Sequence, residues 1–335
     1  MRHAITATMS TSHKIRWSHG EAEVTTLAGM LTDCRFALPT GPFRPFARAP
    51  WLGTVDDSAI IGHLRVLSGD FVCLPMGTGR PMPDAPEPWA TLNAAYPPYH
   101  PIHGPAADAE WEITRADETS VTLTLVYPQD SAVERIERTI SGRADAPALD
   151  FTMTVFARRK TPMSLGLHPM FRLPEQAGRL RLDADFAFGL IHPGRLRPGD
   201  TMEFSSLSEV PLPEGAVDFS HVPLTPKMDC NVQMCGMTTP LTATWLDEGA
   251  GIVLDWDREL IPSMQIWHTD GGIGGDPWNH QFRAIGLEPV AAAFDLNDKV
   301  SIGPNPINAR GVRTSVDLDP ASPLVVRYSV TAFTA

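Results

Sequence analysis

Three short segments of the chain place an ionisable side chain beside Gly or Pro at the end of an apolar stretch. They are Tyr99–Pro105 with His100 and His103, Leu165–Phe171 with His168, and Ile285–Val290 with Glu288. Pro follows both His168 and Glu288, and it biases the residue before it to extended geometry and ends regular strand pairing. We therefore expect both side chains at strand ends, where a positioned imidazole and carboxylate could act as a general acid–base pair.

The same residue types also suit a metal ion. Two histidines and one glutamate are ligands that zinc or iron accepts, and the His100-x-x-His103 spacing adds a possible pair. From spacing alone, a metal-dependent, cupin-like β protein therefore remains a competing interpretation.

Alternating apolar and polar residues are the main local signal along the chain. This pattern is typical of half-buried strands, because successive side chains on a strand point to opposite faces. We expect strands in the alternating runs at 121–127, 133–140, 149–155, 180–188, 252–256, 264–268 and 324–333.

Turns rich in Pro and Gly separate these runs, and no rhythm of strand, helix and strand is visible. Many short strands between turn signals predict an all-β sandwich or barrel. No linker or internal repeat interrupts the pattern, so we expect a loose N-terminal tail over residues 1–13 and a single domain over residues 14–335.

Composition narrows the classes of function. The 27 basic and 39 acidic residues give a net charge of −12, which argues against a nucleic-acid partner. No window of 18 apolar residues is present, so no membrane-spanning helix and no membrane partner are expected. The four scattered cysteines predict reduced core thiols, and the lack of an apolar leader segment makes the cytoplasm the default location.

Taken together and in order, three motifs resemble the aldose 1-epimerase (galactose mutarotase) family. They are the segments HGPAADAEW at 103–111, LHPMFRL at 167–173 and GLEPV at 286–290, and the resemblance extends over about residues 20–333. It implies an all-β supersandwich of antiparallel sheets with an open sugar-binding cleft. It also implies an isomerase that interconverts the α and β anomers of a free hexose without any metal or organic cofactor.

The resemblance also assigns roles to residues. Glu288 matches the general base of the family, His168 its general acid, and His103 its second histidine. A substrate-binding Asp is expected between His168 and Glu288, and Asp229 fits that place. An Arg is expected upstream of His103, and Arg80 lies at about the right distance.

The surroundings of Arg80 do not reproduce the Gly-Arg-x-x-Asn-Arg segment of the family, so Arg44 and Arg48 are alternatives. Trp267 and Trp278 are candidate stacking platforms for the sugar, because both shortly precede Glu288. The expected partner is a small-molecule sugar, and the sequence indicates no oligomeric state. Two other functions stay open: an enzyme of the same fold that acts on a phosphorylated, sulfonated or oxidised sugar, and a non-catalytic sugar-binding protein.

Overall fold

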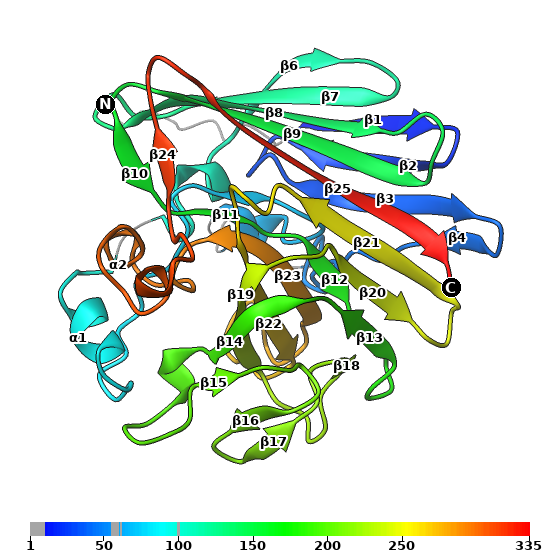
Figure 1. The fold of residues 1–335 in the computed structure, drawn as a ribbon. Coiled ribbons are helices and arrows are strands. Elements are labelled where there is room, and N and C mark those ends of the chain that lie inside the picture. Colours follow the sequence, from blue (N-terminus) through cyan, green and yellow to red (C-terminus); the bar gives the residue numbers. More distant parts are fainter. Residues whose placement is uncertain (1–10, 55–59, 61, 99–100) are drawn as a thin grey trace.

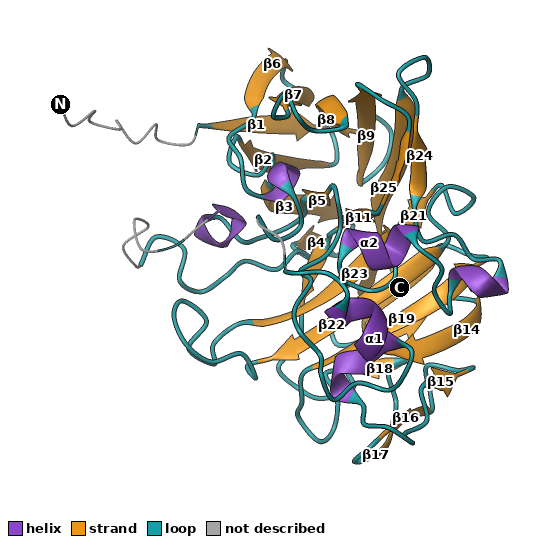
Figure 2. Cartoon of the chain, turned by 90° about the vertical axis from the view of Figure 1, so that its left-hand side faces the viewer, coloured by secondary structure: helices purple, strands orange, loops and turns teal. Residues whose placement is uncertain are grey.

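Antiparallel strands make up most of the chain in the computed structural model, which describes residues 11–54, 60, 62–98 and 101–335. Within these residues the strands form a nine-stranded sheet, an eight-stranded sheet, a four-stranded sheet and two small pairs. Figures 1 and 2 show the two largest sheets packed against each other. In the described residues neither of them closes into a barrel, and the fold is an all-β sandwich.

The nine-stranded sheet forms one layer. Its order is β18 (His221–Val222), β13 (Leu180–Asp183), β20 (Leu241–Trp245), β21 (Ala250–Trp256), β25 (Leu324–Thr334), β9 (Ala148–Ala157), β8 (Val133–Gly142), β7 (Ser120–Val126) and β6 (Glu112–Ala116). Burial alternates along β9, where Leu149, Phe151, Met153 and Val155 point into the core. The predicted strand at 133–140 is confirmed as β8.

The eight-stranded sheet forms the second layer and carries most of the candidate site. Its order is β15 (Glu203–Phe204), β14 (Phe186–Ile191), β19 (Cys230–Met237), β22 (Ser263–Asp270), β23 (Arg283–Ala291), β11 (Leu165–Leu167) and β5 (Val72–Cys73), with β12 (Met170–Arg172) also paired to β23. One face of this sheet packs on the nine-stranded sheet through Val232, Ile266, Ile285 and Leu287.

The remaining elements are short. The four-stranded sheet holds β1 (Ser12–Trp17), β2 (Gly20–Thr25), β3 (Leu31–Leu38) and β4 (Gly41–Phe43), and the small pairs are β10 (Thr161–Met163) with β24 (Val316–Leu318) and β16 (Val210–Leu212) with β17 (Gly215–Val217). The helices α1 (Trp89–Ala94) and α2 (Asp298–Ile302) lie on one side of the molecule (Figure 2), and 3₁₀ turns cover Gly62–Arg65, Pro105–Ala107, Pro193–Arg195 and Asn308–Arg310.

Two expectations need adjustment. The alternating run at 180–188 is not one strand: β13 belongs to the nine-stranded sheet and β14 to the eight-stranded sheet. The chain crosses between the layers at Asp185, whose backbone N–H donates to Thr239 Oγ1 and whose carbonyl accepts from the Thr238 N–H. Of the predicted N-terminal tail, residues 1–10 lie outside the described residues, whereas Ser12 and His13 belong to β1.

A buried ionic cluster joins the two layers. The Asp70 carboxylate accepts hydrogen bonds from Arg138 on β8 and from the hydroxyl of Tyr328 on β25, the latter at 2.6 Å. Arg138 also donates to the Gly29 carbonyl at 2.6 Å. Asp70 lies just before Phe71 and β5, and Phe71 lines the cavity, so the nine-stranded sheet holds this segment in place from behind.

The four cysteines are free and buried, as the sequence predicts. Burial raises the pKa of each thiol, so none of them is a reactive thiolate at neutral pH. In the described part of the chain, no helix has both the length and the apolar character needed to cross a membrane.

Candidate active site

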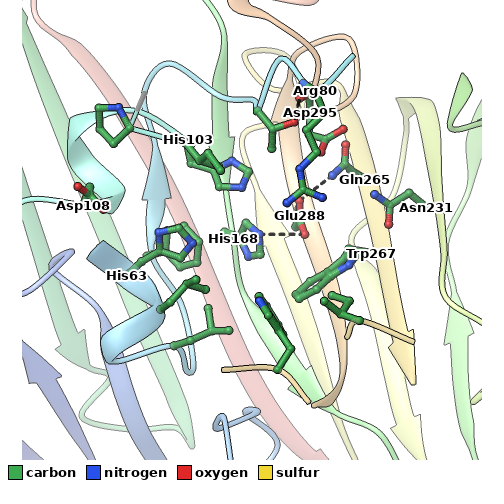
Figure 3. A pocket seen from close by; sticks show the side chains of 18 residues that line it. His63, Arg80, His103, Asp108, His168, Asn231, Gln265, Trp267, Glu288 and Asp295 are labelled. Atoms are coloured by element: carbon green, nitrogen blue, oxygen red, sulfur yellow. Dashed lines mark hydrogen bonds and ion pairs between the residues drawn. The ribbon is translucent and has the colours of Figure 1, made fainter. Parts of the chain in front are cut away.

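The outward face of the eight-stranded sheet lines a cavity of about 580 Å³. Six of the predicted site residues meet there: Arg80, His103, His168, Trp267, Trp278 and Glu288. Figure 3 shows His168 and Glu288 side by side in the middle of the cavity, with Arg80 entering from one side.

Strand register explains why these side chains share one face. Glu288 on β23 lies directly opposite Gln265 on β22, and Trp267 lies between Gly286 on β23 and Asn231 on β19. Residues two apart on a strand point the same way, so all the side chains in this row face the cavity. Gln265 and Asn231 join the site through this register. Gln265 precedes Trp267 by two residues, which is its only sequence signal, and Asn231 has none because it lies on another strand.

Glu288 lies within β23 and not at its end, so this part of the strand-end prediction is wrong. The Leu287 N–H donates to the Pro169 carbonyl in the gap between β11 and β12, which both pair with this side of β23. Pro289 lies two residues further on, so its backbone nitrogen points towards the same gap as the Leu287 N–H does. A proline without an N–H is tolerated where no neighbouring strand needs a donor.

His168 does lie at a strand end, in the turn between β11 and β12. Its backbone N–H donates to the Phe71 carbonyl at 2.9 Å, and its ring stacks on the Phe71 ring with centroids 4.3 Å apart. These contacts aim the imidazole at Glu288, and 3.3 Å separates His168 Nε2 from Glu288 Oε1. The other oxygen of Glu288 accepts a 3.1 Å hydrogen bond from Gln265 Nε2.

Burial controls the protonation of this pair, since Glu288 is 1 % exposed and His168 is 6 % exposed. Burial raises the pKa of Glu288 well above its ordinary value, and the nearby Asp295 carboxylate raises it further, whereas the Gln265 hydrogen bond opposes the rise. Burial, and then the neighbouring His103 and His63, lower the pKa of His168. Both shifts favour the uncharged pair, in which Glu288 carries the shared proton and the His168 imidazole is neutral.

Gly286 makes room for the Glu288 carboxylate. A Cβ at position 286 would lie 2.3 Å from Glu288 Oε1, which is too close for any real contact. We expect Gly286→Ala to turn the carboxylate away from His168 and to lower kcat by about tenfold or more, because misplacement of a catalytic group by about 1 Å is costly. Steady-state kinetics would measure the loss, and a thermal unfolding midpoint near that of the wild type would show that the sheet is intact. Full activity in a folded variant would contradict this placement of Glu288.

His103 approaches the pair from a loop. Its backbone has a positive φ of 62° and is held by the Gly77 carbonyl, which accepts its N–H, and by the Leu74 N–H, which donates to its carbonyl. The His103 and His168 ring centroids are 5.5 Å apart. Burial lowers the pKa of His103 to about 4, so its imidazole is neutral at pH 7. Its buried Nδ1 has no hydrogen-bond partner among the described residues, and a ligand could use it.

An aromatic wall borders the cavity beside the pair. The Trp267 centroid lies 5.9 Å from His168 and 6.2 Å from Trp278, both in edge-on geometry. Trp278 in turn packs edge-on against Trp51 at 4.9 Å. Aromatic rings of this kind accept the C–H faces of a pyranose.

Asp295 is a site residue that the sequence analysis missed. It lines the cavity seven positions after Glu288, on a segment held by Gln233, which accepts from the Phe294 N–H at 2.7 Å. Burial would raise the pKa of Asp295, but His192, whose Nε2 lies 2.8 Å from its carboxylate, lowers it to about 2 together with His103 and Arg80. Asp295 is therefore a permanent anion, and no sequence motif marks it.

The structure does not bring Asp229 into the cavity. Its carboxylate accepts hydrogen bonds from the Thr269 hydroxyl at 2.9 Å and from the backbone N–H groups of Asp270 at 2.7 Å and Gly272 at 3.1 Å. Asp229 thus fastens the loop that carries Trp278, and Asn231, two residues later, takes the place that lines the cavity.

Neither alternative arginine lines the cavity. Arg44 pairs with Asp33 at 2.6 Å at the surface, and Arg48 is exposed where its segment pairs with Ser68. Arg80 does line it, despite the missing family segment around it. Within the described residues, no group of three or more His, Cys, Asp or Glu side chains could hold a metal ion, and His100 lies outside those residues.

Comparison with solved structures identifies the fold. A putative aldose 1-epimerase from Escherichia coli K12 superposes with a TM-score of 0.66 at 15% identity, covering 97% of this chain and 100% of that one. A GalM/aldose epimerase homologue from C. elegans superposes with a TM-score of 0.65 at 13% identity, covering 97% of this chain and 99% of that one. A galactose mutarotase-like protein from Lactobacillus casei superposes with a TM-score of 0.60 at 15% identity, covering 96% of this chain and 100% of that one.

The chain has the galactose mutarotase-like fold. This confirms the predicted fold class, a supersandwich of antiparallel sheets. No protein-family model matches the sequence, and no curated protein matches it either. The galactose mutarotase-like fold is thus shown by the arrangement of the strands, and the chemistry must be argued from the residues of the cavity.

Proposed function

We propose that the protein is an aldose 1-epimerase that interconverts the α and β anomers of a free, uncharged hexose. The observation that carries the proposal is the buried pair of Glu288 and His168, 3.3 Å apart at the centre of the cavity, with His103 beside it. A protein that only binds sugar would not need a proton donor and a proton acceptor in contact at this place.

The pair can perform both proton transfers of anomer exchange. Glu288 takes the proton from the O1 hydroxyl while His168 gives a proton to the ring oxygen O5, and the C1–O5 bond breaks to leave an open-chain aldehyde. Rotation about C1–C2 presents the other face of the aldehyde, and ring closure reverses both transfers. In this direction Glu288 is the base and His168 is the acid, so the reactive form has the shared proton on His168, whereas burial favours the form with that proton on Glu288. His103 is placed to hydrogen-bond the oxygen whose charge changes.

The charge of the cavity favours an uncharged sugar over a phosphorylated, sulfonated or oxidised one. Arg80 is the only Lys or Arg that lines the cavity among the described residues, and it lies close enough to the Asp295 anion to lower its pKa. Arg172, another possible source of positive charge, pairs with Glu248 at 2.6 Å outside the cavity. Hydroxyl groups suit the amide and carboxylate groups of Asn231, Gln265 and Asp295.

Polarimetry of freshly dissolved α-D-glucose and α-D-galactose tests the proposal. We expect the wild-type protein, in buffer with a chelator, to speed the approach to anomeric equilibrium in proportion to enzyme concentration. No acceleration of either sugar by folded protein would overturn the proposed reaction. Acceleration that the chelator removes would instead favour the metal-dependent interpretation.

The pH profile gives a second test that involves Asp295. Because Glu288 must be ionised to act as a base and its pKa is raised, kcat/KM should fall on the acid side with a midpoint above the ordinary carboxyl value. Asp295→Asn removes an anion that raises the pKa of Glu288, so this midpoint should move to lower pH. Mutarotation rates from pH 4 to pH 8 would measure the shift, and an unchanged or higher midpoint would show that Asp295 does not act on Glu288.

A further inference from the structure

The cavity extends to both sides of the catalytic pair. Figure 3 shows Asn231, Gln265 and Asp295 on one side of His168, where a pyranose would find partners for its hydroxyl groups. The other side holds His63 and Asp108. Together with Leu64 and Trp278, which also line the cavity, they form a group that is here called the distal arm. The proposed proton transfers use none of these four side chains.

The aromatic wall leads from the catalytic pair to the distal arm. Trp278 packs against Trp267 on one side and against Trp51 on the other. The Trp51 indole N–H donates to the Leu64 carbonyl at 2.8 Å, so Trp51 connects Trp278 to Leu64. The distal arm therefore offers an indole and an aliphatic side chain, which suit the C–H faces of a sugar.

Asp108 supplies the polar part of the distal arm. A Cβ on Gly62, which has a φ of +52°, would lie 1.3 Å from Asp108 Oδ1, so the carboxylate occupies space that only a glycine leaves free. Burial raises the pKa of Asp108, and no described residue offers it a hydrogen bond or an ion pair. His63 adds a buried Nδ1 with no partner in the described residues. Polar groups that are half-buried and unpaired are suited to hydroxyl groups of a ligand.

We propose that the distal arm is a second sugar subsite, so that the preferred substrate is a reducing disaccharide whose reducing hexose lies at Glu288 and His168. The inference rests on the proposed function and adds the substrate class. A cavity of about 580 Å³ is larger than one hexose fills. No Lys or Arg lines the distal arm among the described residues, and Asp108 adds a carboxylate, so the arm suits the hydroxyl groups of a pyranose better than a phosphate group.

Substrates that share one reducing unit test the subsite. Lactose, maltose and melibiose all end in a reducing glucose and differ in the linkage of the second pyranose. We expect kcat/KM for at least one of them to exceed that for glucose by about tenfold, the worth of one good aromatic contact. Equal kcat/KM values for glucose and all three disaccharides would overturn the subsite and leave the hexose reaction standing.

Variants of the distal arm locate the effect. Leu64→Trp fills the arm and Asp108→Asn removes the carboxylate, so both should bring the ratio of disaccharide to glucose kcat/KM towards one. Asp145→Asn, at an exposed turn outside the cavity, is the matched control and should keep the wild-type ratio. A ratio that both distal-arm variants leave unchanged would overturn the assignment.

Binding to the inactive Glu288→Gln variant separates the two proposals. Isothermal titration calorimetry should show tighter binding of the preferred disaccharide than of glucose, without any need for turnover. Equal affinities would count against the distal arm alone. If neither sugar binds and the wild type does not accelerate mutarotation, both the subsite and the proposed function are overturned.

Discussion

Replacing Glu288 by Gln should reduce kcat for mutarotation by about 10²–10⁴-fold, the usual worth of one positioned acid–base group. The amide matches the carboxylate in shape and can keep its contact with Gln265, but it cannot take the O1 proton. The change therefore removes the base and leaves the cavity walls in place. Polarimetry with freshly dissolved α-D-galactose or α-D-glucose measures the loss.

The same variant has an opposite effect on stability. The pKa of Glu288 is raised in the folded protein, so the folded state binds this proton more tightly than the unfolded chain does. Its contribution to stability is present at low pH and is lost as pH rises towards the folded-state pKa. We expect Glu288→Gln to unfold at a higher temperature than the wild type at pH 8 and to lose this advantage near pH 4. In the kinetic test, turnover by Glu288→Gln at the wild-type rate would rule out Glu288 as the base.

Replacing Arg138 by Met should lower the free energy of unfolding by about 3–5 kcal/mol, because it leaves the Asp70 carboxylate buried without its cation. Asp70 and Arg138 are both fully buried, and burial already raises the pKa of Asp70 although Arg138 opposes the rise. The Tyr328 hydroxyl would still donate to that carboxylate, but it supplies no positive charge. Urea unfolding at pH 8 measures the loss.

Two controls connect this loss to the charge. Without Arg138 the pKa of Asp70 rises further, so the folded state gains stability as pH falls and the deficit at pH 5 should be smaller than at pH 8. Arg138→Met combined with Asp70→Asn should recover part of the stability, since no charge is then buried. A deficit that is the same at both pH values and in the double variant would indicate lost packing instead.

The Arg138 cluster also bears on the site. Asp70 precedes Phe71, whose carbonyl accepts from the His168 N–H and whose ring stacks on the imidazole. The nine-stranded sheet therefore supports His168, the proposed acid, through one buried carboxylate. This link joins residues 70, 138 and 328, which are too far apart in the chain for any local pattern to reveal.

Local patterns were reliable where they report on a single element. The alternation of Leu149, Phe151, Met153 and Val155 predicted a half-buried strand, because burial on one face is a property of the strand itself. The same reasoning wrongly predicted one strand over residues 180–188. The alternation continues in phase across Asp185, where the chain crosses between the sheets, and it does not reveal which sheet each half enters.

By itself, the sequence determined the class of the protein and the residues at the centre of its site. The alternation of apolar and polar residues and the turn signals predicted an all-β chain. The motifs around His103, His168 and Glu288 pointed to three side chains that do line one cavity. Motifs of this kind are readable because Pro restricts the backbone next to these side chains and Gly allows conformations that other residues avoid.

Only the tertiary structure decided what surrounds that centre. Asn231 and Gln265 reach the cavity through strand register, Asp295 through a segment held by Gln233, and Asp229 is diverted to fasten a loop. The physical reason is that register and loop anchoring depend on partners distant in sequence. The acidity of a carboxylate such as Glu288 likewise depends on its burial between those partners, which no single segment of the chain encodes.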